Sequence, residues 1–276
     1  MRPLWLAVPL AALILLHLFL IVPRTGKKKR RGLFLGRLYA HRGLYEADGA
    51  PENSMAAFRC AVKHKCAVEA DVRLSADGVP VVFHDESLAR MCGIERRTEN
   101  LSAAALTACT LADTKETIPT LRDVVTLIGN RVPLMVHLMG EAADTALCDT
   151  VLPLLENAGT DYCVCAEEPA LLARFRRIAP DVVRVLLVPE RGTQSGMRGF
   201  LLRSLLENRK ARPDIIAAHT EDGGRYPIRL CRTLGAAVMG GIITDREGYT
   251  RVKKRFDAYI CENIPELLRK PKKKKE

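Results

Sequence analysis

From Arg37 onward the sequence alternates between short apolar runs and longer segments whose apolar residues recur with helical spacing. Short apolar runs bounded by turn residues predict buried strands, which fall at 37–41, 66–74, 79–84, 132–139, 161–166, 181–188, 213–219, 236–244 and 256–261. Helical spacing predicts helices at 51–65, 120–130, 141–159 and 169–179. Alternation of this kind builds a parallel sheet covered by helices. With about eight strands in 37–265, the sequence predicts a (β/α)8 TIM barrel of the α/β class rather than an open doubly wound sheet.

The segment 196–210 lies between two predicted strands and carries an apolar stripe at helical spacing, formed by Phe200, Leu201, Leu202, Leu205 and Leu206. A helix packed on the barrel is the favoured interpretation of this stripe. A helix that dips into a bilayer surface is the alternative.

Residues 3–23 form an apolar segment without Asp, Glu, Lys or Arg. At 1.5 Å per residue such a helix spans about 30 Å, the thickness of a hydrocarbon core, so we expect a transmembrane anchor over 1–23. A cleaved signal peptide competes with this interpretation, but no small-residue cleavage site follows. Six Lys or Arg residues lie in 24–31, after the span, and one precedes it. The positive-inside rule therefore predicts a single-pass membrane protein with its catalytic domain in the cytoplasm.

The formal net charge of +11 is concentrated at the two ends of the chain. A basic linker at 24–36 and a basic tail at 266–276 flank a body, 37–265, that is nearly neutral. A domain that binds nucleic acid carries its own basic face, so this distribution argues against nucleic acid as a partner. Basic ends on a neutral body favour an anionic lipid surface instead. The nine cysteines, an odd number without a C-x-x-C pair, fit a reducing compartment.

Polar residues fall at one end of the predicted strands. Glu69 and Asp71 are two residues apart, so a strand places both carboxylates on one face. Burying this pair requires a neutralising group, and a divalent cation bound through oxygen is the simplest one. His41 and His84 each end a predicted strand, and the strand ends of a barrel converge on the face where active sites lie. We therefore expect these four side chains to meet.

The neighbours Arg42 and Asp85 join this group in the predicted barrel mouth. Two histidines beside a metal act as general acid and base near neutral pH. The guanidinium fork of Arg42 suits an anionic oxygen, most naturally of a phosphate. The residues thus predict metal-assisted displacement at a phosphodiester.

Four blocks carry a resemblance to the glycerophosphodiester phosphodiesterase (GDPD) family: Ala40-His41-Arg42-Gly43, Pro51-Glu52-Asn53-Ser54, Glu69-x-Asp71, and Asp77-Gly78 followed by His84-Asp85. They match in order and spacing over residues 40–92, and the resemblance continues more faintly to about residue 262. It implies a TIM barrel that uses Mg²⁺ or Ca²⁺ to cleave glycerophosphodiesters to glycerol 3-phosphate and an alcohol. Relatives at membranes act on lysophospholipids, so a lysophospholipid is the second substrate class implied.

Residue roles follow from the resemblance only at matching positions. It implies His41 and His84 as the acid–base pair and Glu69 and Asp71 as metal ligands. It places Arg42 on the phosphate, with Glu52, Asn53 and Asp85 shaping the substrate pocket.

The chain departs from the family pattern on later strands. Where the family has Glu-x-Lys, this sequence has His137 and Met139, and Cys165 stands where another Glu is usual. An isoleucine near Ile243 replaces an aromatic residue. If His137 binds the metal, imidazole favours Mn²⁺ or Zn²⁺ over Mg²⁺ or Ca²⁺. The alternatives are a degenerate barrel that binds a phosphodiester or lipid without turnover, and a membrane-anchored interaction module.

Overall fold

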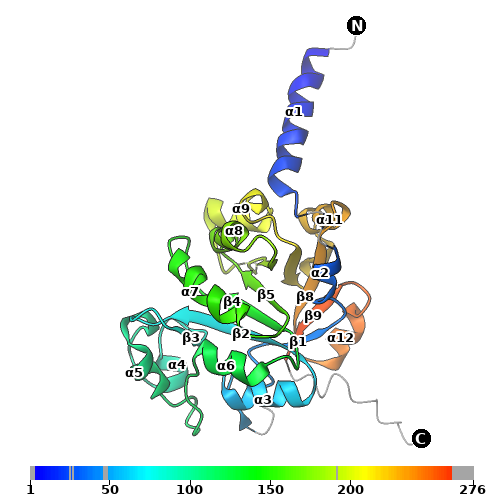
Figure 1. Cartoon of the computed structure of the whole chain (residues 1–276). Helices are drawn as coiled ribbons and strands as arrows, with labels where there is room; N and C mark the ends of the chain where they lie inside the picture. The colour runs from blue at the N-terminus through cyan, green and yellow to red at the C-terminus, as the bar shows by residue number, and fades with distance from the viewer. Residues whose placement is uncertain (1–3, 25, 27, 46–48, 191, 263–276) are drawn as a thin grey trace, which may run out of the picture.

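The computed structural model describes residues 4–24, 26, 28–45, 49–190 and 192–262. In this part of the chain eight parallel strands close a barrel (Figure 1): β1 Leu38–Ala40, β2 Ala67–Leu74, β4 Leu134–Leu138, β5 Tyr162–Ala166, β6 Val183–Leu187, β7 Ile215–His219, β8 Ala237–Ile243 and β9 Ala258–Cys261. They pair in chain order, and β1 closes the ring by pairing with both β2 and β9. The predicted TIM barrel is confirmed.

The strand predicted at 79–84 does not belong to the barrel ring. β3, Pro80–Val82, pairs antiparallel with β2, with Val72 opposite Val82. Its prediction as a third parallel strand is wrong, because the Asp77-Gly78 turn leaves too few residues for the crossover that parallel strands require. The hairpin returns the chain toward the barrel mouth, so His84 reaches the strand ends from the opposite direction.

Helices cover the outside of the barrel (Figure 1): α3 Met55–Lys63, α6 Leu121–Ile128, α7 Thr145–Glu156, α8 Pro169–Ile178, α9 Gly196–Arg203, α10 Asn208–Ala211, α11 Tyr226–Thr233 and α12 Arg246–Val252. Short helices α4, Ala89–Cys92, and α5, Ala103–Thr107, follow β3. Thr120 caps α6 in a reciprocal capping box with Asp123. Ser54 caps α3 by accepting a hydrogen bond from Ala57 N, so this helix begins later than predicted and leaves Asn53 available for the barrel mouth.

Two packed layers hold the barrel together. One face of β2 contributes Val68, Ala70 and Val72 to the layer between strands and helices. The barrel interior is a separate cluster that includes Tyr39, Met135, Cys163 and Cys165. The alternation of β2 therefore directs Glu69 and Asp71 inward, above that cluster.

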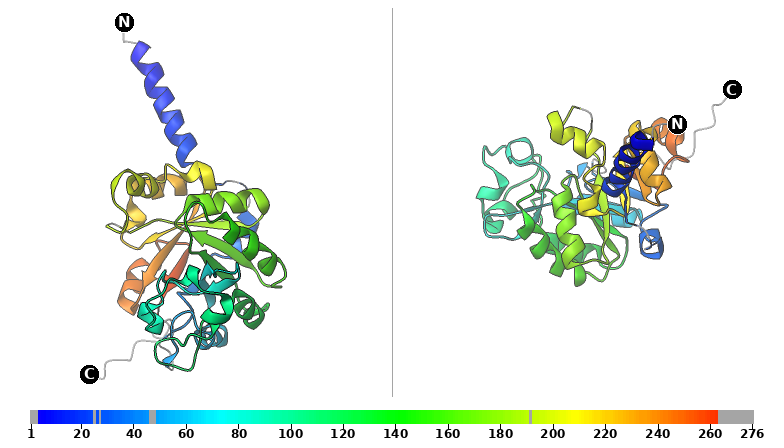
Figure 2. Two further views of the ribbon diagram at one scale, coloured as in Figure 1. Left: turned by 90° about the vertical axis from the view of Figure 1, so that its left-hand side faces the viewer. Right: turned by 90° about the horizontal axis from the view of Figure 1, so that it is seen from above.

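Helix α1, Leu4–Ile21, projects away from the barrel (Figures 1 and 2). Its last turn packs on the body, where Ile21 is fully buried and its carbonyl oxygen accepts a hydrogen bond from Asn208 Nδ2 at 2.9 Å. Within the part of the chain that the structure describes, no helix has both the length and the hydropathy of a membrane span.

The residues predicted as a basic linker, 24–36, lie against the barrel where the structure describes them. Helix α2, Lys28–Gly32, is held by a 2.6 Å hydrogen bond from Arg31 Nη1 to the carbonyl oxygen of Gly235. Phe34 is buried and packs on the barrel interior. The predicted basic tail, 266–276, lies outside the described residues.

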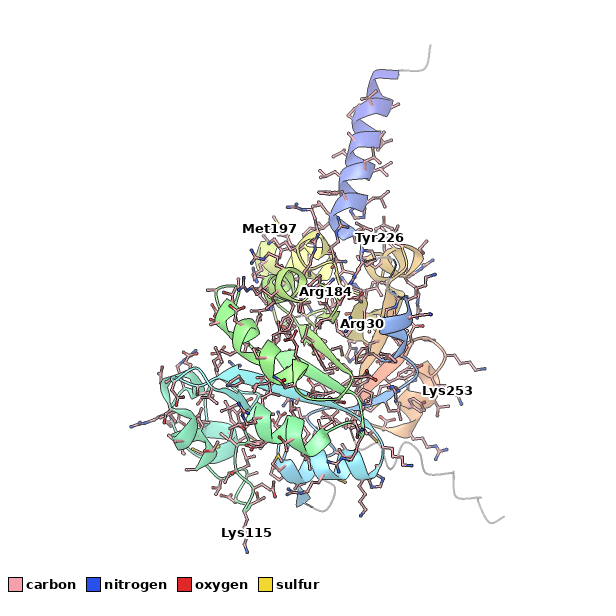
Figure 3. All side chains as sticks on the ribbon, viewed as in Figure 1. Arg30, Lys115, Arg184, Met197, Tyr226 and Lys253 are labelled. Atoms are coloured by element: carbon pink, nitrogen blue, oxygen red, sulfur yellow. The ribbon has the colours of Figure 1, made fainter. Side chains whose placement is uncertain are left out.

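The stripe predicted in 196–210 runs from α9 into the turn that separates α9 from α10. Leu205, between the two helices, has a positive φ of 57°, which ends the helical run. Leu202 and Leu205 are buried, as a helix packed on the barrel requires. Phe200 is 56% exposed and Met197 is 72% exposed, so α9 also presents apolar side chains outward (Figure 3).

Candidate active site

Three neighbouring strands bring the site's buried polar residues to one level. Asp71 on β2 lies opposite His137 on β4, and His137 lies opposite Cys165 on β5. Side chains in register on parallel strands project to the same side, so all three enter the barrel interior. Glu69 lies two residues before Asp71 on the same face, and both carboxylates are buried.

His137 neutralises these carboxylates directly. Its Nδ1 lies 2.8 Å from Asp71 Oδ1 and 3.5 Å from Glu69 Oε1. Burial alone would lower the pKa of His137, but its hydrogen bonds to Asp71 and Glu69 outweigh burial and raise that pKa to about 10. Burial would likewise raise the pKa of Asp71, yet His137 and Arg42 hold that pKa well below its usual range.

Arg42 connects the strand ends to the loop before α3. Its backbone N–H donates to Glu69 Oε2 at 2.8 Å, and its Nη1 donates to Glu52 Oε1 at 2.9 Å. The Nε atom of Arg42 lies 3.1 Å from Asp71 Oδ2. Asn53 Nδ2 donates to the same Asp71 oxygen at 2.9 Å, and Asn53 Oδ1 accepts from the Asp71 backbone N–H. The predicted residues Glu52 and Asn53 therefore gather with Arg42 around the carboxylates.

The Arg42–Gly43 turn depends on positive φ angles of 54° and 81°. An added Cβ at Gly43 would lie 2.9 Å from Ala57 Cβ and 3.0 Å from Phe58 Cδ1. We expect Gly43→Ala to lower the free energy of unfolding by about 1–3 kcal/mol, measured by urea denaturation. Gly78→Ala is the matched control, because Gly78 also has a positive φ but an added Cβ meets nothing within 4 Å. An equal loss in the two variants would contradict the assignment of close packing to Gly43.

Each predicted catalytic histidine is oriented by a carboxylate. His41 Nδ1 lies 3.0 Å from Glu262 Oε1, and His84 Nδ1 lies 2.7 Å from Asp85 Oδ1. Because a carboxylate engages Nδ1 in both rings, Nε2 is the nitrogen left to exchange a proton with a substrate. The hairpin positions His84 through a hydrogen bond from Arg73 Nε to the His84 carbonyl oxygen at 2.7 Å.

Arg90, on α4, joins the loops on this side of the mouth. It donates to Asp85 Oδ2 at 2.6 Å and to Glu52 Oε1 at 2.6 Å. These charge-assisted bonds connect the carboxylate that holds His84 to the carboxylate that holds Arg42. A substitution at Arg90 would therefore disturb both sides of the site.

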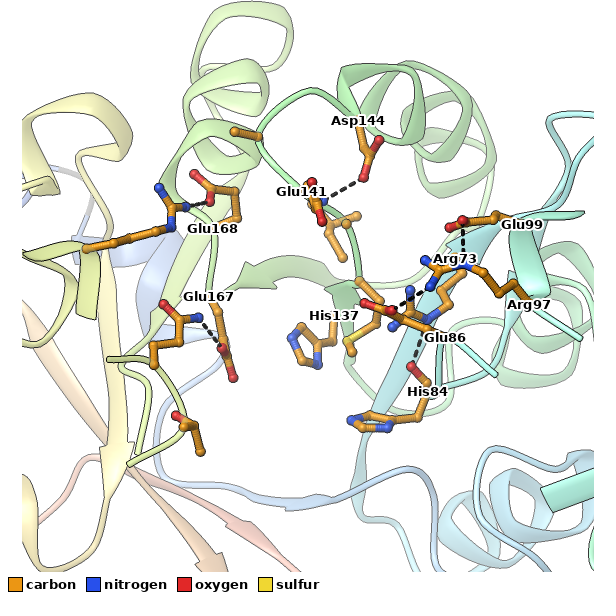
Figure 4. Close-up of a pocket in the computed structure, with 17 residues that line it drawn as sticks. Arg73, His84, Glu86, Arg97, Glu99, His137, Glu141, Asp144, Glu167 and Glu168 are labelled. Carbon is orange, nitrogen blue, oxygen red and sulfur yellow. Dashed lines mark hydrogen bonds and ion pairs between the residues drawn. The ribbon is translucent and has the colours of Figure 1, made fainter. Parts of the chain in front are cut away.

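Two adjoining cavities form the site. The inner cavity, of about 180 Å³, is lined by the strand-end residues His41, Arg42, Glu69, His84 and His137. The lining of the outer cavity, of about 1360 Å³, includes Arg73, Arg97, Met139 and Arg198. His84, His137 and Glu167 line both cavities, and Figure 4 shows them around one hollow. The arrangement offers a small polar inner compartment and a wider outer one for the rest of a ligand.

The ligand atoms of Glu69, His137 and Cys165 lie within 4.8 Å of one another, close enough to hold one metal ion. Asp71, a predicted ligand, is instead engaged with Arg42, Asn53 and His137. The site can thus hold a metal, and its ligand atoms come from three strands.

The structure brings the predicted residues together and adds two that the sequence analysis missed. Glu262 follows β9 directly, so the strand-end argument used for His41 would have found it. Arg90 lies on a short helix after an antiparallel hairpin, and no sequence pattern marks it. Cys165 was recognised only as the replacement of a carboxylate.

The pairing of His41 with Glu262 predicts a pH effect. Burial lowers the pKa of His41, but the Glu262 hydrogen bond and the charge of Glu69 outweigh burial and raise it. Removing the charge of Glu262 must therefore lower that pKa. In Glu262→Gln we expect the limb of the pH profile of kcat/KM that reports His41 to move to lower pH, whereas Glu247→Gln, at an exposed site on α12, leaves the profile unchanged. A shift to higher pH, or no shift, would contradict this pairing.

Comparison with known proteins agrees with this geometry. The chain aligns with glycerophosphodiester phosphodiesterase 1 of Bos taurus at 32% identity over 54% of this chain and 47% of the relative. It therefore spans about half the length of the curated relatives it matches. Two solved structures share the fold. A phosphodiesterase from Oleispira antarctica, in complex with the product sn-glycerol-3-phosphate, has a TM-score of 0.71 at 22% identity, with 84% of this chain and 95% of that chain covered. A glycerophosphoryl diester phosphodiesterase from Silicibacter pomeroyi has a TM-score of 0.69 at 21% identity, with 86% and 94% covered.

A closed parallel barrel whose mouth gathers two oriented histidines, an arginine and buried carboxylates defines a TIM-barrel protein with groups suited to acid–base chemistry at the carboxyl ends of its strands. The model of the glycerophosphoryl diester phosphodiesterase family matches residues 41–197, which include His41, Glu69, His84 and His137. The chain belongs to that family.

Proposed function

We propose that this chain hydrolyses glycerophosphodiesters to glycerol 3-phosphate and an alcohol. The observation that carries the proposal is the pair of histidines, His41 and His84, each oriented by a carboxylate and both lining the inner cavity with Arg42. Family membership and the fold shared with a phosphodiesterase that holds sn-glycerol-3-phosphate support the same reaction.

The two histidines have different roles in proton transfer, His41 as the acid and His84 as the base. The hydrogen bond with Glu262 raises the pKa of His41, which favours the protonated ring and suits it to protonate the leaving alcohol oxygen. His84 accepts the proton of the attacking hydroxyl or water as the new phosphorus–oxygen bond forms. Asp85 and Glu262 hold the two rings in place and stabilise their charged forms.

Arg42 and, when it is bound, a metal ion would stabilise the negative charge of the phosphate. The guanidinium of Arg42, already beside the inner cavity, is placed to contact a non-bridging phosphoryl oxygen. The clustered ligand atoms of Glu69, His137 and Cys165 fit a divalent cation, and Asp71 supports His137 beside them. When bound, this cation supplies positive charge to the phosphoryl oxygens as they become more negative.

A direct assay tests this proposal. The purified chain is incubated with glycerophosphocholine or glycerophosphoethanolamine, with Mg²⁺, Ca²⁺, Mn²⁺ or Zn²⁺ in turn, and glycerol 3-phosphate is measured. Release of glycerol 3-phosphate supports the proposal. A folded protein that binds glycerol 3-phosphate but turns over neither diester with any metal would favour the degenerate binding barrel, for which the existing engagement of Arg42 by Glu52 and Asp71 is the supporting observation.

We propose further that the N-terminal helix attaches the barrel to the cytoplasmic face of a membrane. Support comes from the charge-free segment 3–23, the basic residues after it, and the large exposed fractions of α1 side chains such as Val8 and Leu15, 69% and 66%. Exposed Met197 and Tyr226 lie on the side of the body from which α1 projects (Figure 3). This location would give the outer cavity access to a lysophospholipid as well as to soluble diesters.

Vesicle sedimentation tests the membrane proposal. The chain should sediment with vesicles that contain anionic lipid, and the double variant Leu13→Lys, Leu16→Lys should remain in the supernatant, because charges on α1 oppose burial in hydrocarbon. Equal sedimentation of both proteins would overturn it. For the lipid substrate, a lysophospholipid should compete with glycerophosphocholine for turnover, and failure to compete would exclude that substrate class.

A further inference from the structure

Cys165 occupies an unusual position for a cysteine. It is fully buried in the barrel interior, in register with His137, and its ligand atom lies within 4.8 Å of those of Glu69 and His137. A thiol that coordinates a metal ion does so as the thiolate, so a bound cation would displace the proton of Cys165.

His137 is already oriented as a metal-binding histidine. An ionised carboxylate can only accept a hydrogen bond, so Nδ1 of His137 donates to Asp71 Oδ1 at 2.8 Å. This carboxylate–histidine contact fixes the ring, as the partners of metal-binding histidines do. Asp71 is itself held by Arg42 and Asn53, so its role is to position His137.

The ligand atoms of this cluster decide which ion fits. Mg²⁺ and Ca²⁺ require six or more oxygen ligands, as a general rule of their chemistry, whereas this group offers one carboxylate, one imidazole and one thiol. Zn²⁺ takes nitrogen, sulfur and oxygen ligands together, and catalytic zinc sites use three protein ligands with one position left open. Thiolate and imidazole also bind Zn²⁺ in preference to hard cations such as Mg²⁺ and Ca²⁺.

We infer that Glu69, His137 and Cys165 form a three-ligand site for Zn²⁺-class ions, with Cys165 as the ligand that selects them over Mg²⁺ and Ca²⁺. The site is the one that the proposed function uses, so the open position would face the phosphate. Metal binding itself does not depend on that function, which allows the two to be tested separately.

Cobalt titration of the whole chain tests the inference, because Co²⁺ substitutes for Zn²⁺ and reports its ligands by absorption. We expect a near-ultraviolet thiolate-to-cobalt charge-transfer band at one equivalent, removed by Zn²⁺ and retained in excess Mg²⁺ or Ca²⁺. Cys165→Ala should abolish the band. Cys163→Ala is the matched control: Cys163 is also fully buried in the barrel interior, two residues earlier on β5, and its loss should leave the band intact.

The possible outcomes separate the metal site from the catalytic function. Absence of the band in the wild-type chain, its survival in Cys165→Ala, or its removal by Mg²⁺ would overturn the inference. If His137 serves as a fixed positive charge in place of a metal, the titration shows no band. Diester hydrolysis with Mg²⁺ and no thiolate band would overturn the metal site and leave the proposed function standing. A thiolate band without diester hydrolysis would support the metal site and overturn the proposed function.

Discussion

His41→Ala and His84→Ala are each expected to lower kcat for glycerophosphodiester hydrolysis by about 10²- to 10⁴-fold, the usual contribution of a positioned acid or base. Both side chains line the inner cavity, and each is oriented by a carboxylate, Glu262 for His41 and Asp85 for His84. Removing one imidazole removes the acid or the base for one proton transfer, while Arg42 remains placed to bind the phosphate. The loss should therefore fall mainly on kcat, with a smaller change in KM.

His64→Ala is the control for these variants, because His64 lies exposed at the end of α3, outside both cavities of the site. It should keep the wild-type rate. Since the two histidines act in one reaction, the double variant should lose little more than the worse single variant. Wild-type rates in either histidine variant would remove that residue from the chemistry.

Asp71→Ala is expected to lower the free energy of unfolding by about 3–5 kcal/mol, the cost of leaving buried charges without their partner. Asp71 is fully buried, and its carboxylate contacts His137, Arg42 and Asn53. Without it, Arg42 and the ring of His137 lose the carboxylate that both of them contact. The large expected loss of stability comes mainly from the buried groups that remain without a partner, and less from the net stabilisation that the intact ion pairs provide.

Urea denaturation measures this loss, with Asp149→Ala as the control. Asp149 pairs with Arg174 on the surface, where its side chain is 43% exposed, so its removal should cost less than about 1 kcal/mol. The depressed pKa of Asp71 also sets a pH dependence: its stabilisation is present above the ordinary aspartate pKa of about 3.9 and is lost as pH falls below that value. Similar losses in the two variants would contradict the role of Asp71 in the core of the site.

The barrel could be predicted from the sequence because its strands are apolar runs separated by helices, a pattern that depends on local spacing alone. The same local reasoning placed His41 and Arg42 at a strand end, and it would have placed Glu262 at the end of β9. It failed for 79–84, where a short connection from β2 made the strand antiparallel. His84 nevertheless reaches the site, since the hairpin returns it to the level of Asp71, where Phe83 N donates to the Asp71 carbonyl oxygen at 2.9 Å.

The placement of Cys165 beside Glu69 and His137 could not be predicted, because it depends on register between strands. The sequence shows a cysteine where a carboxylate would be expected, which indicates loss of a ligand. Only the pairing of β2, β4 and β5 places the thiol beside Glu69 and His137. The segment 196–210 illustrates the same limit, because its apolar pattern does not mark the positive φ of Leu205 at which the helix is interrupted.

Phosphorus-31 NMR of glycerophosphocholine mixed with the 276-residue chain and Zn²⁺ tests the proposed reaction most directly. The diester resonance should fall while the monoester resonance of glycerol 3-phosphate rises by the same amount, and the double variant His41→Ala, His84→Ala should show neither change. An unchanged diester resonance, from folded protein shown to bind cobalt through Cys165, would contradict hydrolysis at this site. A phosphocholine resonance in place of glycerol 3-phosphate would contradict the assigned bond cleavage.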